Sequence, residues 1–169
     1  VLGDVLDGPL AETVASVGER AVAVRLDVTH PEDWREAVHL ALQTFGRIDI
    51  LVNNAGVMQF ASFEDTSVEL MRTTLDVNVM GAFHGMQAVV PHMKQARRGS
   101  IVNISSLSGL MGNNAVAAYA TSKWALRGLS RCAALELGLH GIRVNTIHPG
   151  GIDTKMGNPG KLPREQLDQ

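Results

Sequence analysis

The fold is decided by residues 100–148, which read SIVNISSLSGLMGNNAVAAYATSKWALRGLSRCAALELGLHGIRVNTIH. Residues 100–104 form a short apolar run that is typical of a buried strand, and residues 143–148 form another. Residues 116–139, which lie between these runs, have the length and the apolar spacing of a helix. A strand, a helix and a second strand in this order predict a crossover unit whose strands are parallel.

The rest of the chain repeats this order of strand and helix. Strands are predicted at residues 1–5, 21–26 and 48–53, and helices at residues 7–17, 29–45 and 67–95. Gly18 and Gly46 follow the first two of these helices and are predicted to end them. Thr29 and Glu32 have the spacing of a capping box at the start of the second. The alternation predicts an α/β fold with a doubly wound, Rossmann-like parallel sheet in a single domain.

The composition is that of an ordinary globular protein, with 45% hydrophobic and 19% charged residues among 169. The 15 basic and 17 acidic residues give a net charge of −2, without a basic run that would indicate binding to nucleic acid or to an anionic membrane. Small, roughly neutral partners are favoured instead. Cys132 is the only cysteine, which excludes an intramolecular disulfide and favours a reducing compartment. Without a signal peptide or an apolar run of ~20 residues, we expect a cytoplasmic location.

Polar or small residues follow the predicted strands, at the edge where open parallel sheets bind ligands. Asp4 ends the first strand, and its carboxylate can accept hydrogen bonds from the ribose hydroxyls of a dinucleotide or can lead into and cap the following helix. Asp27, followed by Val28, ends the second strand and can accept from an adenine amino group or close an Asx-turn. Residues 53–56 read NNAG after the third strand, where small residues either let a cofactor approach closely or form a plain turn.

Three further polar residues follow the fourth strand. Ser106 comes directly after it, Tyr119 lies 13 residues further along, and Lys123 lies four residues beyond Tyr119. Because residues four apart share a helix face, Tyr119 and Lys123 are predicted to lie side by side. A tyrosine and a lysine at this spacing are also common on helix surfaces, so only the combination with Ser106 indicates a reaction site.

In this order, NNAG at residues 53–56, Ser106, Tyr119-x-x-x-Lys123 and Pro149-Gly150 resemble the motifs of the short-chain dehydrogenase/reductase family. The resemblance covers essentially the whole chain. Residues 100–106, 109–112 and 122–130 look most like the bacterial 3α(or 20β)-hydroxysteroid dehydrogenases of that family. This resemblance implies an NAD(P)-dependent oxidoreductase that interconverts a secondary alcohol and a ketone. Its substrate would be a bulky apolar small molecule such as a hydroxysteroid.

The resemblance also implies a role for each motif residue. Tyr119 would be the general acid and base, and Lys123 would supply a positive charge and hold the nicotinamide ribose. Ser106 would donate a hydrogen bond to the substrate oxygen. Asn78 matches an asparagine that kinks the long helix and positions a water in the proton relay, although a buried, hydrogen-bonded Asn without that role is the alternative. The cofactor-binding residues implied are Asp4, Asp27, Val28, Asn54, Ala55, Gly56, Tyr119, Lys123, Pro149, Gly150, Ile152 and Thr154.

The cofactor is expected to be NAD rather than NADP. Asp4 repels a 2′-phosphate, and Val5 and Leu6 follow it without an Arg or Lys that could bind one. The family's first strand with its glycine-rich turn, and its last strand, have no counterpart in the sequence. We therefore expect residues 1–169 to be a partial domain, truncated at both ends. Since the family's first strand lies centrally, two sheet halves with an unfilled slot between them are expected.

Several partners and alternatives complete these expectations. An apolar substrate pocket could be lined by the loop residues Met58, Leu107, Leu110, Met111 and Met156. The helices that pair across subunits in the family correspond to residues 67–95 and 116–139, so a homodimer or homotetramer is expected. No metal site is expected, because the six histidines lack metal-ligand spacing and are interpreted as surface or helix-end residues. The alternatives are a 3-oxoacyl-thioester reductase of the same family and a non-catalytic truncated or scaffold chain.

Overall fold

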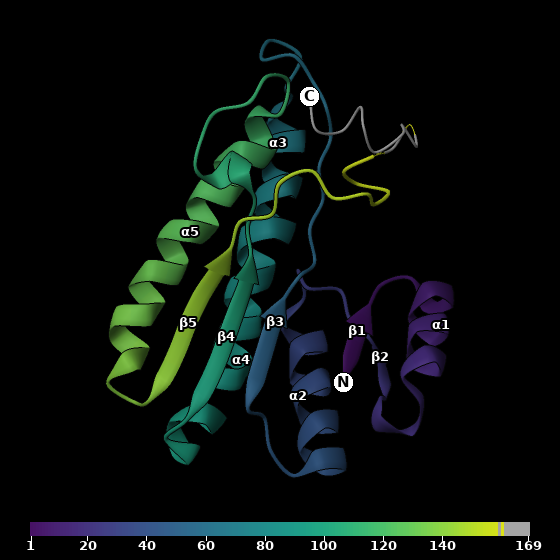
Figure 1. The fold of residues 1–169 in the computed structure, drawn as a ribbon, viewed down its shortest axis with the longest axis vertical. Helices are drawn as coiled ribbons and strands as arrows, with labels where there is room; N and C mark the ends of the chain where they lie inside the picture. Colours follow the sequence, from purple (N-terminus) through teal and green to yellow (C-terminus); the bar gives the residue numbers. More distant parts are fainter. Residues whose placement is uncertain (159, 161–169) are drawn as a thin grey trace.

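The computed structural model describes residues 1–158 and residue 160, and its strands form two parallel sheets (Figure 1). In the smaller sheet, β1 (Leu2–Asp4) pairs with β2 (Ala23–Arg25). In the larger sheet, the strand order is β3 (Ile50–Asn53), β4 (Gly99–Ile104) and β5 (Ile142–Ile147). Among the described residues, no strand pairing joins the two sheets. The predicted α/β class with parallel strands is confirmed, as is the division into two sheet halves.

Helices alternate with these strands. They are α1 (Asp7–Val17), α2 (Pro31–Phe45), α3 (Val68–Leu75), α4 (Gly81–Ala96) and α5 (Ala117–Gly138), together with 3₁₀ turns η1 (Gly18–Arg20) and η3 (Leu107–Gly109) and a π-helical segment η2 (Asp76–Met80). Gly18 and Gly46 end α1 and α2 with φ angles of 76° and 75°, which glycine adopts without a steric penalty. Both predicted helix ends are confirmed. None of the described helices is long and apolar enough to cross a membrane.

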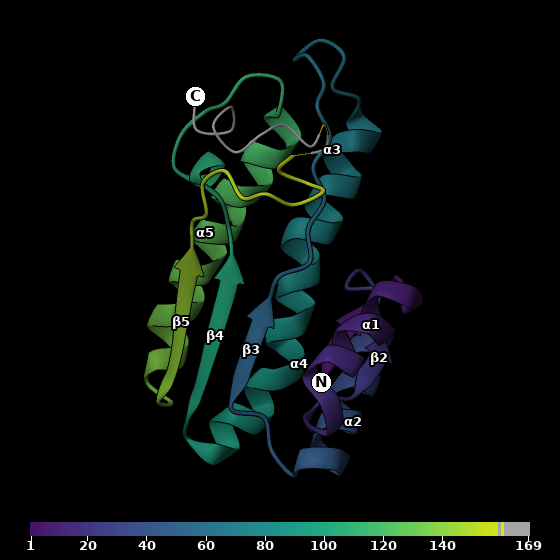
Figure 2. The ribbon, with the colours of Figure 1, turned by 45° about the vertical axis from the view of Figure 1, so that its right-hand side comes forward.

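The main core lies between the larger sheet and the two helices α4 and α5, which pack against the same face of it (Figures 1 and 2). Its buried members are Met86, Val89, Met93, Ile101, Leu137, Ile142 and Val144. Alternate residues of β3 point to the opposite face, where Ile50 and Val52 are 65% and 54% exposed. The described helices therefore cover only one face of this sheet.

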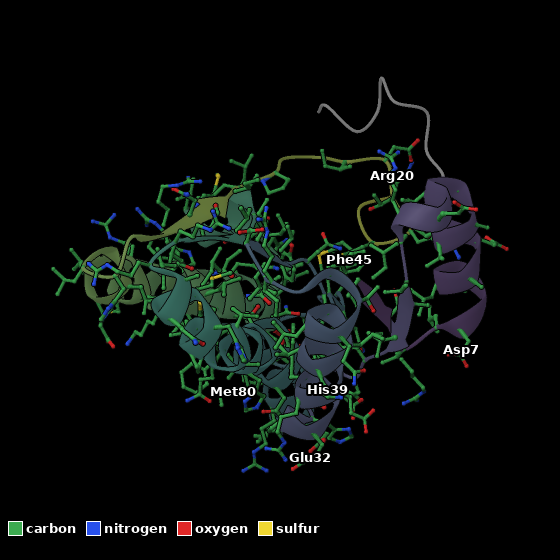
Figure 3. The ribbon with its side chains drawn as sticks, turned by 90° about the horizontal axis from the view of Figure 1, so that it is seen from below. Asp7, Arg20, Glu32, His39, Phe45 and Met80 are labelled. Carbon is green, nitrogen blue, oxygen red and sulfur yellow. The ribbon has the colours of Figure 1, made fainter. Side chains whose placement is uncertain are left out.

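Helix α2 lies between the small α1–β1–β2 unit and the larger sheet, as seen from below in Figure 3. Trp34 of α2 packs with Leu26 in a second buried cluster that also reaches α4. Gly85 of α4 allows this close packing, because a Cβ atom added there would lie 2.6 Å from the Trp34 ring. Glu32 and His39, labelled in Figure 3, lie on the exposed side of α2.

The predicted helix at residues 67–95 is one continuous rod that contains α3, η2 and α4 (Figure 2). Ser67 caps its start, because the Ser67 hydroxyl accepts a hydrogen bond of 3.0 Å from the amide of Leu70. In the middle of the rod, the five residues Asp76–Met80 change to π-helical bonding. Such segments often occur at functional sites, and this one contains Asn78.

The predicted capping box at the start of α2 is wrong. His30 is the N-cap residue and makes no capping bond with its side chain. The amide and hydroxyl of Thr29 both donate to Asp27 Oδ1, at 3.0 and 2.7 Å. Thr29 donates to the Asp27 carboxylate and does not accept from an amide of the first helical turn, so it completes a turn with Asp27 instead of capping the helix.

Candidate active site

The carboxyl ends of β4 and β5 extend into two loops that run side by side. The parallel ladder continues past the strands, because Ser105 N donates to Ile147 O at 2.8 Å and Leu107 N donates to Pro149 O at 3.0 Å. Ser106 lies between these two bonds and is the residue directly before η3. The ladder therefore fixes the backbone of the predicted serine beside the loop that begins at Pro149.

Lys123 is a buried cation on α5, with only 4% of its surface exposed. Its Nζ donates a hydrogen bond of 2.8 Å to the carbonyl oxygen of Ile104, at the end of β4. Burial lowers the pKa of Lys123 from 10.5 to about 8, because the charged form loses its hydration. Ser105 Oγ donates to Lys123 O at 3.1 Å, which ties this turn of α5 to the strand. Within the described part of the chain, no acidic side chain forms an ion pair with Lys123.

Tyr119 lies one helical turn before Lys123 and is also buried. The Lys123 Nζ atom lies 5.4 Å from the centre of the Tyr119 ring, so the predicted sharing of one helix face is found in the structure. Ser122, between them in sequence, donates from its hydroxyl to the carbonyl oxygen of Tyr119 at 2.7 Å. The same hydroxyl accepts a bond of 2.9 Å from Asn78 Nδ2.

Asn78 joins three segments and is 1% exposed. Besides its bond to Ser122, its Nδ2 donates to Val57 O at 2.9 Å, and its Oδ1 accepts from Val57 N at 2.8 Å. The asparagine therefore holds the loop after β3 against α5. A Cβ atom added at Gly56 would lie 3.3 Å from Asn78 Oδ1 and 3.5 Å from Lys123 Nζ. The fold thus brings together Gly56, Asn78 and Lys123, which are far apart in sequence.

Ser106 is partly exposed and has extended backbone geometry. Its Oγ accepts a hydrogen bond of 3.1 Å from the amide of Ser108. That bond uses a lone pair, so the hydroxyl hydrogen can be donated to another group. The following turn packs tightly on α5 at Gly109, where an added Cβ atom would lie 2.6 Å from Ser105 Oγ and 2.9 Å from Lys123 O.

The predicted adenosine-binding residues follow the two strands of the smaller sheet. Asp4 is exposed and its Oδ1 accepts from Leu6 N at 2.9 Å. The hydroxyl and amide of Thr29 hold the pKa of Asp27 below its usual value of 3.8. Both carboxylates thus make local bonds: Asp27 closes the Asx-turn that is its alternative interpretation, and Asp4 bonds to Leu6, the residue before α1. Val28 packs on the long helix, since a Cβ atom added at Gly81 would lie 2.6 Å from Val28 Cγ2.

The remaining predicted cofactor residues lie in the loops after β3 and β5. Asn54 and Ala55 are exposed. Gly150 faces η3, because an added Cβ atom would lie 3.4 Å from Leu107 Cδ1. The exposed Ile152 accepts a bond from Thr154 N at 2.8 Å, and Thr154 Oγ1 accepts one from Gly157 N at 3.0 Å. These bonds form a turn in the loop that continues from Pro149.

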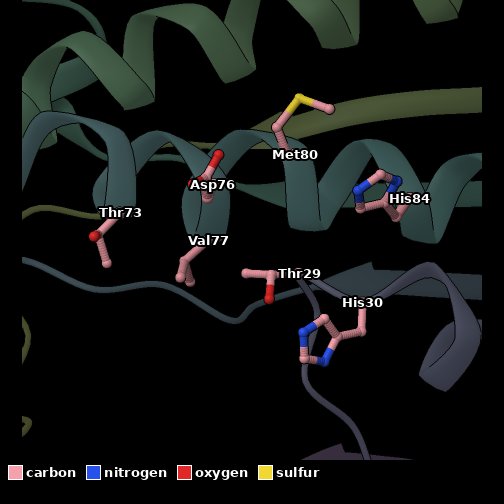
Figure 4. A pocket seen from close by; sticks show the side chains of 7 residues that line it. All are labelled: Thr29, His30, Thr73, Asp76, Val77, Met80 and His84. Carbon is pink, nitrogen blue, oxygen red and sulfur yellow. The ribbon is translucent and has the colours of Figure 1, made fainter. Parts of the chain in front are cut away.

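Apolar side chains in the loops at this edge are exposed and do not belong to the core. They are Leu107, Leu110, Met111, Ile152 and Met156. A separate groove of about 510 Å³ lies beside the residues that follow Asp27 and Val28 (Figure 4). It is lined by Thr29, His30, Thr73, Asp76, Val77, Met80 and His84. Among the described residues, no group of three or more His, Cys, Asp or Glu side chains could hold a metal ion.

Three polar contacts at this edge are not foreseen by the sequence analysis. Ser105 and Ser122 anchor the turn of α5 that carries Tyr119 and Lys123. His148 is neither a surface nor a helix-end residue, because it is partly buried and its Nδ1 lies 2.9 Å from the carbonyl oxygen of Ser106. Ligands of open parallel sheets bind at the carboxyl ends of the strands, and the position of His148 directly after β5 could have marked it as a candidate.

The chain is similar to known proteins in sequence and in backbone. A model of the family described as short chain dehydrogenase matches residues 1–163. The chain is 47% identical over 156 residues to a 3-alpha-(or 20-beta)-hydroxysteroid dehydrogenase of Mycobacterium tuberculosis, which covers 92% of this chain and 60% of that protein. It is 48% identical over 136 residues to trans-4-hydroxycyclohexanecarboxylate dehydrogenase of Sinomonas cyclohexanicum, which covers 80% of this chain and 52% of that protein.

Solved structures show the same backbone. A short-chain dehydrogenase from Streptomyces avermitilis superposes with a TM-score of 0.84 and 35% identity, covering 91% of this chain and 58% of that one. An NAD⁺-bound xylitol dehydrogenase superposes with a TM-score of 0.86 and 39% identity, covering 90% of this chain and 60% of that one. The chain spans about 60% of the length of these relatives.

Proposed function

The chain belongs to the short-chain dehydrogenase family, and from this premise we propose that the protein interconverts a secondary alcohol and a ketone with NAD as hydride carrier. The environment of Lys123 carries the proposal. Its ammonium is buried without an acidic partner among the described residues and lies 5.4 Å from the centre of the Tyr119 ring. A buried charge of this kind costs stability, and such costs are concentrated at functional sites.

The residues around Lys123 fit a dinucleotide. Gly56 leaves open the space that a side chain would fill next to Lys123 Nζ. When bound, NAD would supply the hydride acceptor. Asn54, Ala55 and Gly56 would line its path, and Lys123 would donate hydrogen bonds to the nicotinamide ribose. Pro149, Gly150, Ile152 and Thr154 would shape the loop that holds the carboxamide.

The adenosine end would be held at the smaller sheet. Asp4 would accept from the ribose hydroxyls, and Asp27 with Val28 would contact the adenine. The exposed Asp4 carboxylate is followed by Val5 and Leu6, so no cation at these positions would bind a 2′-phosphate. This absence of a cation supports NAD over NADP. The similar xylitol dehydrogenase is likewise described as NAD⁺-bound.

The proton chemistry follows from the hydrogen bonds. Because Ser106 Oγ already accepts from Ser108 N, its hydrogen would be donated to the substrate oxygen and would fix that oxygen near Tyr119. Tyr119 would take the hydroxyl proton during oxidation and return one during reduction. The Lys123 charge would stabilise the resulting phenolate. Asn78, which sets the loop after β3 against α5, would position the water that passes the proton onward.

The substrate that we propose is a bulky apolar ring alcohol such as a hydroxysteroid. Exposed apolar side chains surround the carboxyl edge of the sheet, among them Leu107, Met111 and Met156. Two of the similar relatives are named for alcohols on rings, a hydroxysteroid and a hydroxycyclohexanecarboxylate. A bound ring alcohol would cover these apolar side chains with the apolar faces of its ring.

We also infer a homodimer or homotetramer through the two long helices. Of the apolar residues on them, Met86 and Leu137 lie in the core, whereas Trp124 is exposed on α5. An exposed tryptophan is typical of an interface between proteins. Sedimentation of the wild-type protein and of Trp124→Glu would test this, since the variant is expected to be smaller than the wild type.

The activity is tested with the purified protein that carries this sequence. NADH formation is measured with a 3α-hydroxysteroid, with cyclohexanol and with a linear secondary alcohol. We expect the steroid to be oxidised with the highest kcat/KM. Tyr119→Phe is expected to lower kcat at least ~100-fold, because the general base is lost. The matched control is Thr121→Ala, an exposed residue of the same helix, and should leave kcat unchanged.

Other outcomes would contradict this assignment. Reduction of a 3-oxoacyl thioester without oxidation of any ring alcohol would point to that branch of the family. A Tyr119→Phe variant as active as the wild type would remove Tyr119 from the mechanism. If the wild-type protein neither binds NAD nor oxidises any alcohol, the enzymatic proposal fails and a scaffold role is favoured.

A further inference from the structure

His148 contacts the predicted serine through a bond that the chemistry above does not use. Its Nδ1 lies 2.9 Å from the carbonyl oxygen of Ser106. A carbonyl oxygen only accepts hydrogen bonds, so Nδ1 must carry a hydrogen and donate it. We propose that His148 is a positioning residue that holds Ser106 in the orientation from which its hydroxyl donates to the substrate oxygen, an inference that rests on the proposed function.

Three hydrogen bonds tie residues 105–107 to residues 147–149. The outer two are backbone bonds, from Ser105 N to Ile147 O at 2.8 Å and from Leu107 N to Pro149 O at 3.0 Å. The middle one comes from the His148 side chain and is the one that reaches Ser106 itself. Pro149 has no backbone N–H, so β5 cannot provide a backbone donor at that residue. In this parallel register a donor at residue 149 would face Ser105 O, and the imidazole donates to the next carbonyl, Ser106 O.

The bond to the Ser106 carbonyl restrains the peptide group that leads into η3. The amide of Ser108, which belongs to the next peptide group along the chain, donates to Ser106 Oγ at 3.1 Å. If the carbonyl turns, that amide moves and the hydroxyl loses the partner that leaves its hydrogen free for the substrate. His148 therefore acts on the serine hydroxyl through the backbone and does not need to touch the substrate.

The same histidine precedes Pro149 and Gly150, which would hold the nicotinamide carboxamide. One side chain thus connects the segment that would orient the substrate oxygen with the segment that would orient the cofactor. Loss of the contact should lower kcat more than it raises KM, because alignment matters most in the transition state. A purely structural role would instead appear as a loss of stability with kcat per folded molecule unchanged.

The test compares His148→Ala with His148→Asn. Asn places an amide N–H as many bonds from Cβ as the imidazole Nδ1 and can replace the donor. We expect His148→Ala to lower kcat about fivefold to tenfold, the effect of one hydrogen bond, and His148→Asn to stay within about twofold of the wild type. His140→Ala, at the opposite end of β5, is the matched control and should be unchanged.

A double-mutant cycle shows whether His148 acts through the serine. In a Ser106→Ala background, the further change His148→Ala should lower kcat less than twofold, because the hydroxyl that it positions is gone. An undiminished loss in that background, or a His148→Asn variant as slow as His148→Ala, would overturn the proposal.

A readout that does not depend on activity separates this proposal from the proposed function. In ¹⁵N-imidazole NMR of the wild-type protein, the neutral His148 ring should carry its hydrogen on Nδ1. A hydrogen on Nε2 alone would overturn the positioning role even in an active enzyme. If Nδ1 carries the hydrogen but the protein oxidises no alcohol, the hydrogen bond exists and the proposed function is wrong. The positioning role in that reaction is then overturned as well.

Discussion

Lys123 occupies an environment that its charge disfavours. The residue is 4% exposed, its Nζ donates a hydrogen bond of 2.8 Å to Ile104 O, and burial lowers its pKa to about 8. The difference from the usual value of 10.5 corresponds to about 3 kcal/mol of disfavoured charging. At neutral pH the folded protein therefore carries a charge that opposes folding, next to the tyrosine that would use it.

Removing this charge should raise the stability of the protein and abolish its activity. Lys123→Met keeps the length of the side chain and removes the buried ammonium. We expect the free energy of unfolding at pH 7 to rise by about 1–2 kcal/mol, because the relief of desolvation is partly offset by the lost bond to Ile104 O. Alcohol oxidation should be abolished. Urea unfolding and NADH formation measure the two effects.

The stability difference between Lys123→Met and the wild type should depend on pH. Between about 8 and 10.5 the unfolded chain still binds the Lys123 proton and the folded chain does not, so wild-type stability rises with pH relative to the variant. The advantage of Lys123→Met should therefore be full below pH 8 and fade towards pH 10.5. Lys94→Met, which removes a partly exposed lysine of α4, serves as the control. An advantage that does not change with pH would show that the ammonium is not the cause.

Asp27 should show the opposite dependence on pH. The Thr29 hydroxyl and then the Thr29 amide lower its pKa, so the stabilisation is present above 3.8 and lost as pH falls through the lower folded value. The side chain is 35% exposed, which limits the effect through solvent screening. Asp27→Asn should lower stability by about 0.5 kcal/mol at pH 7 and by less at pH 3. Urea titrations at both pH values decide this.

At the scale of elements, the long rod α3–η2–α4 is joined to α5 through one asparagine. Asn78 Nδ2 donates to Ser122 Oγ, and Ser122 Oγ donates to the carbonyl of Tyr119. The other bonds of Asn78 hold both backbone groups of Val57. The π-helical bonding of η2 therefore coincides with the point where three segments meet, and the helix carrying Tyr119 is positioned from the neighbouring helix.

Removing Asn78 should weaken this junction in a way that depends on Ser122. Asn78→Ala is expected to lower the free energy of unfolding by about 2–4 kcal/mol, because the backbone groups of Val57 lose their partners. Combined with Ser122→Ala, the losses should fall short of additivity by about 0.5–1.5 kcal/mol. Asn78→Ala with Ser130→Ala is the control pair on the same helix, since Ser130 bonds to Asn103, and should be additive.

The sequence predicts those parts of the fold that depend on neighbouring residues. Gly18 and Gly46 end their helices because a positive φ is a local requirement, and the strand ends carry Ser106 and the aspartates as expected. The bonds of Asn78 are different: the family resemblance implies a kink there, but no local pattern predicts the bond from Asn78 to Val57, 21 residues away. His148 was missed for the same reason, as its partner Ser106 lies 42 residues away. Contacts of this kind become visible only when the fold has brought the segments together.

At the scale of the whole molecule, the described chain consists of two units with unequal cores. The main cluster of seven buried residues belongs to α4, α5, β4 and β5. In the unit of α1, β1 and β2, Leu10 is the buried residue of its helix, and both strands have three residues. Since local stability follows buried apolar contacts, the smaller unit should open more readily than the larger one.

Native-state hydrogen exchange should therefore separate the two units. Amides of α4 and β4 are expected to exchange only through global unfolding, whereas those of α1 and β1 should open at a free energy about 2–4 kcal/mol lower. Leu10→Ala should speed exchange in the smaller unit and leave β4 unchanged, because the two share no strand pairing among the described residues. Equal acceleration in both units would show that they open as one.

Bound NAD should reduce this difference, because the proposed cofactor contacts lie in both units. Asp4 ends β1 and Asp27 follows β2 in the smaller sheet, whereas Lys123 and Gly150 lie at the edge of the larger one. A ligand that bridges them must slow exchange most in the less stable unit, by up to about 2.7 kcal/mol at 100 times its Kd. Asp4→Ala should lose this added protection in β1 and β2. If NAD slows exchange in the larger unit alone, Asp4 does not hold the ribose, and the adenosine end lies elsewhere.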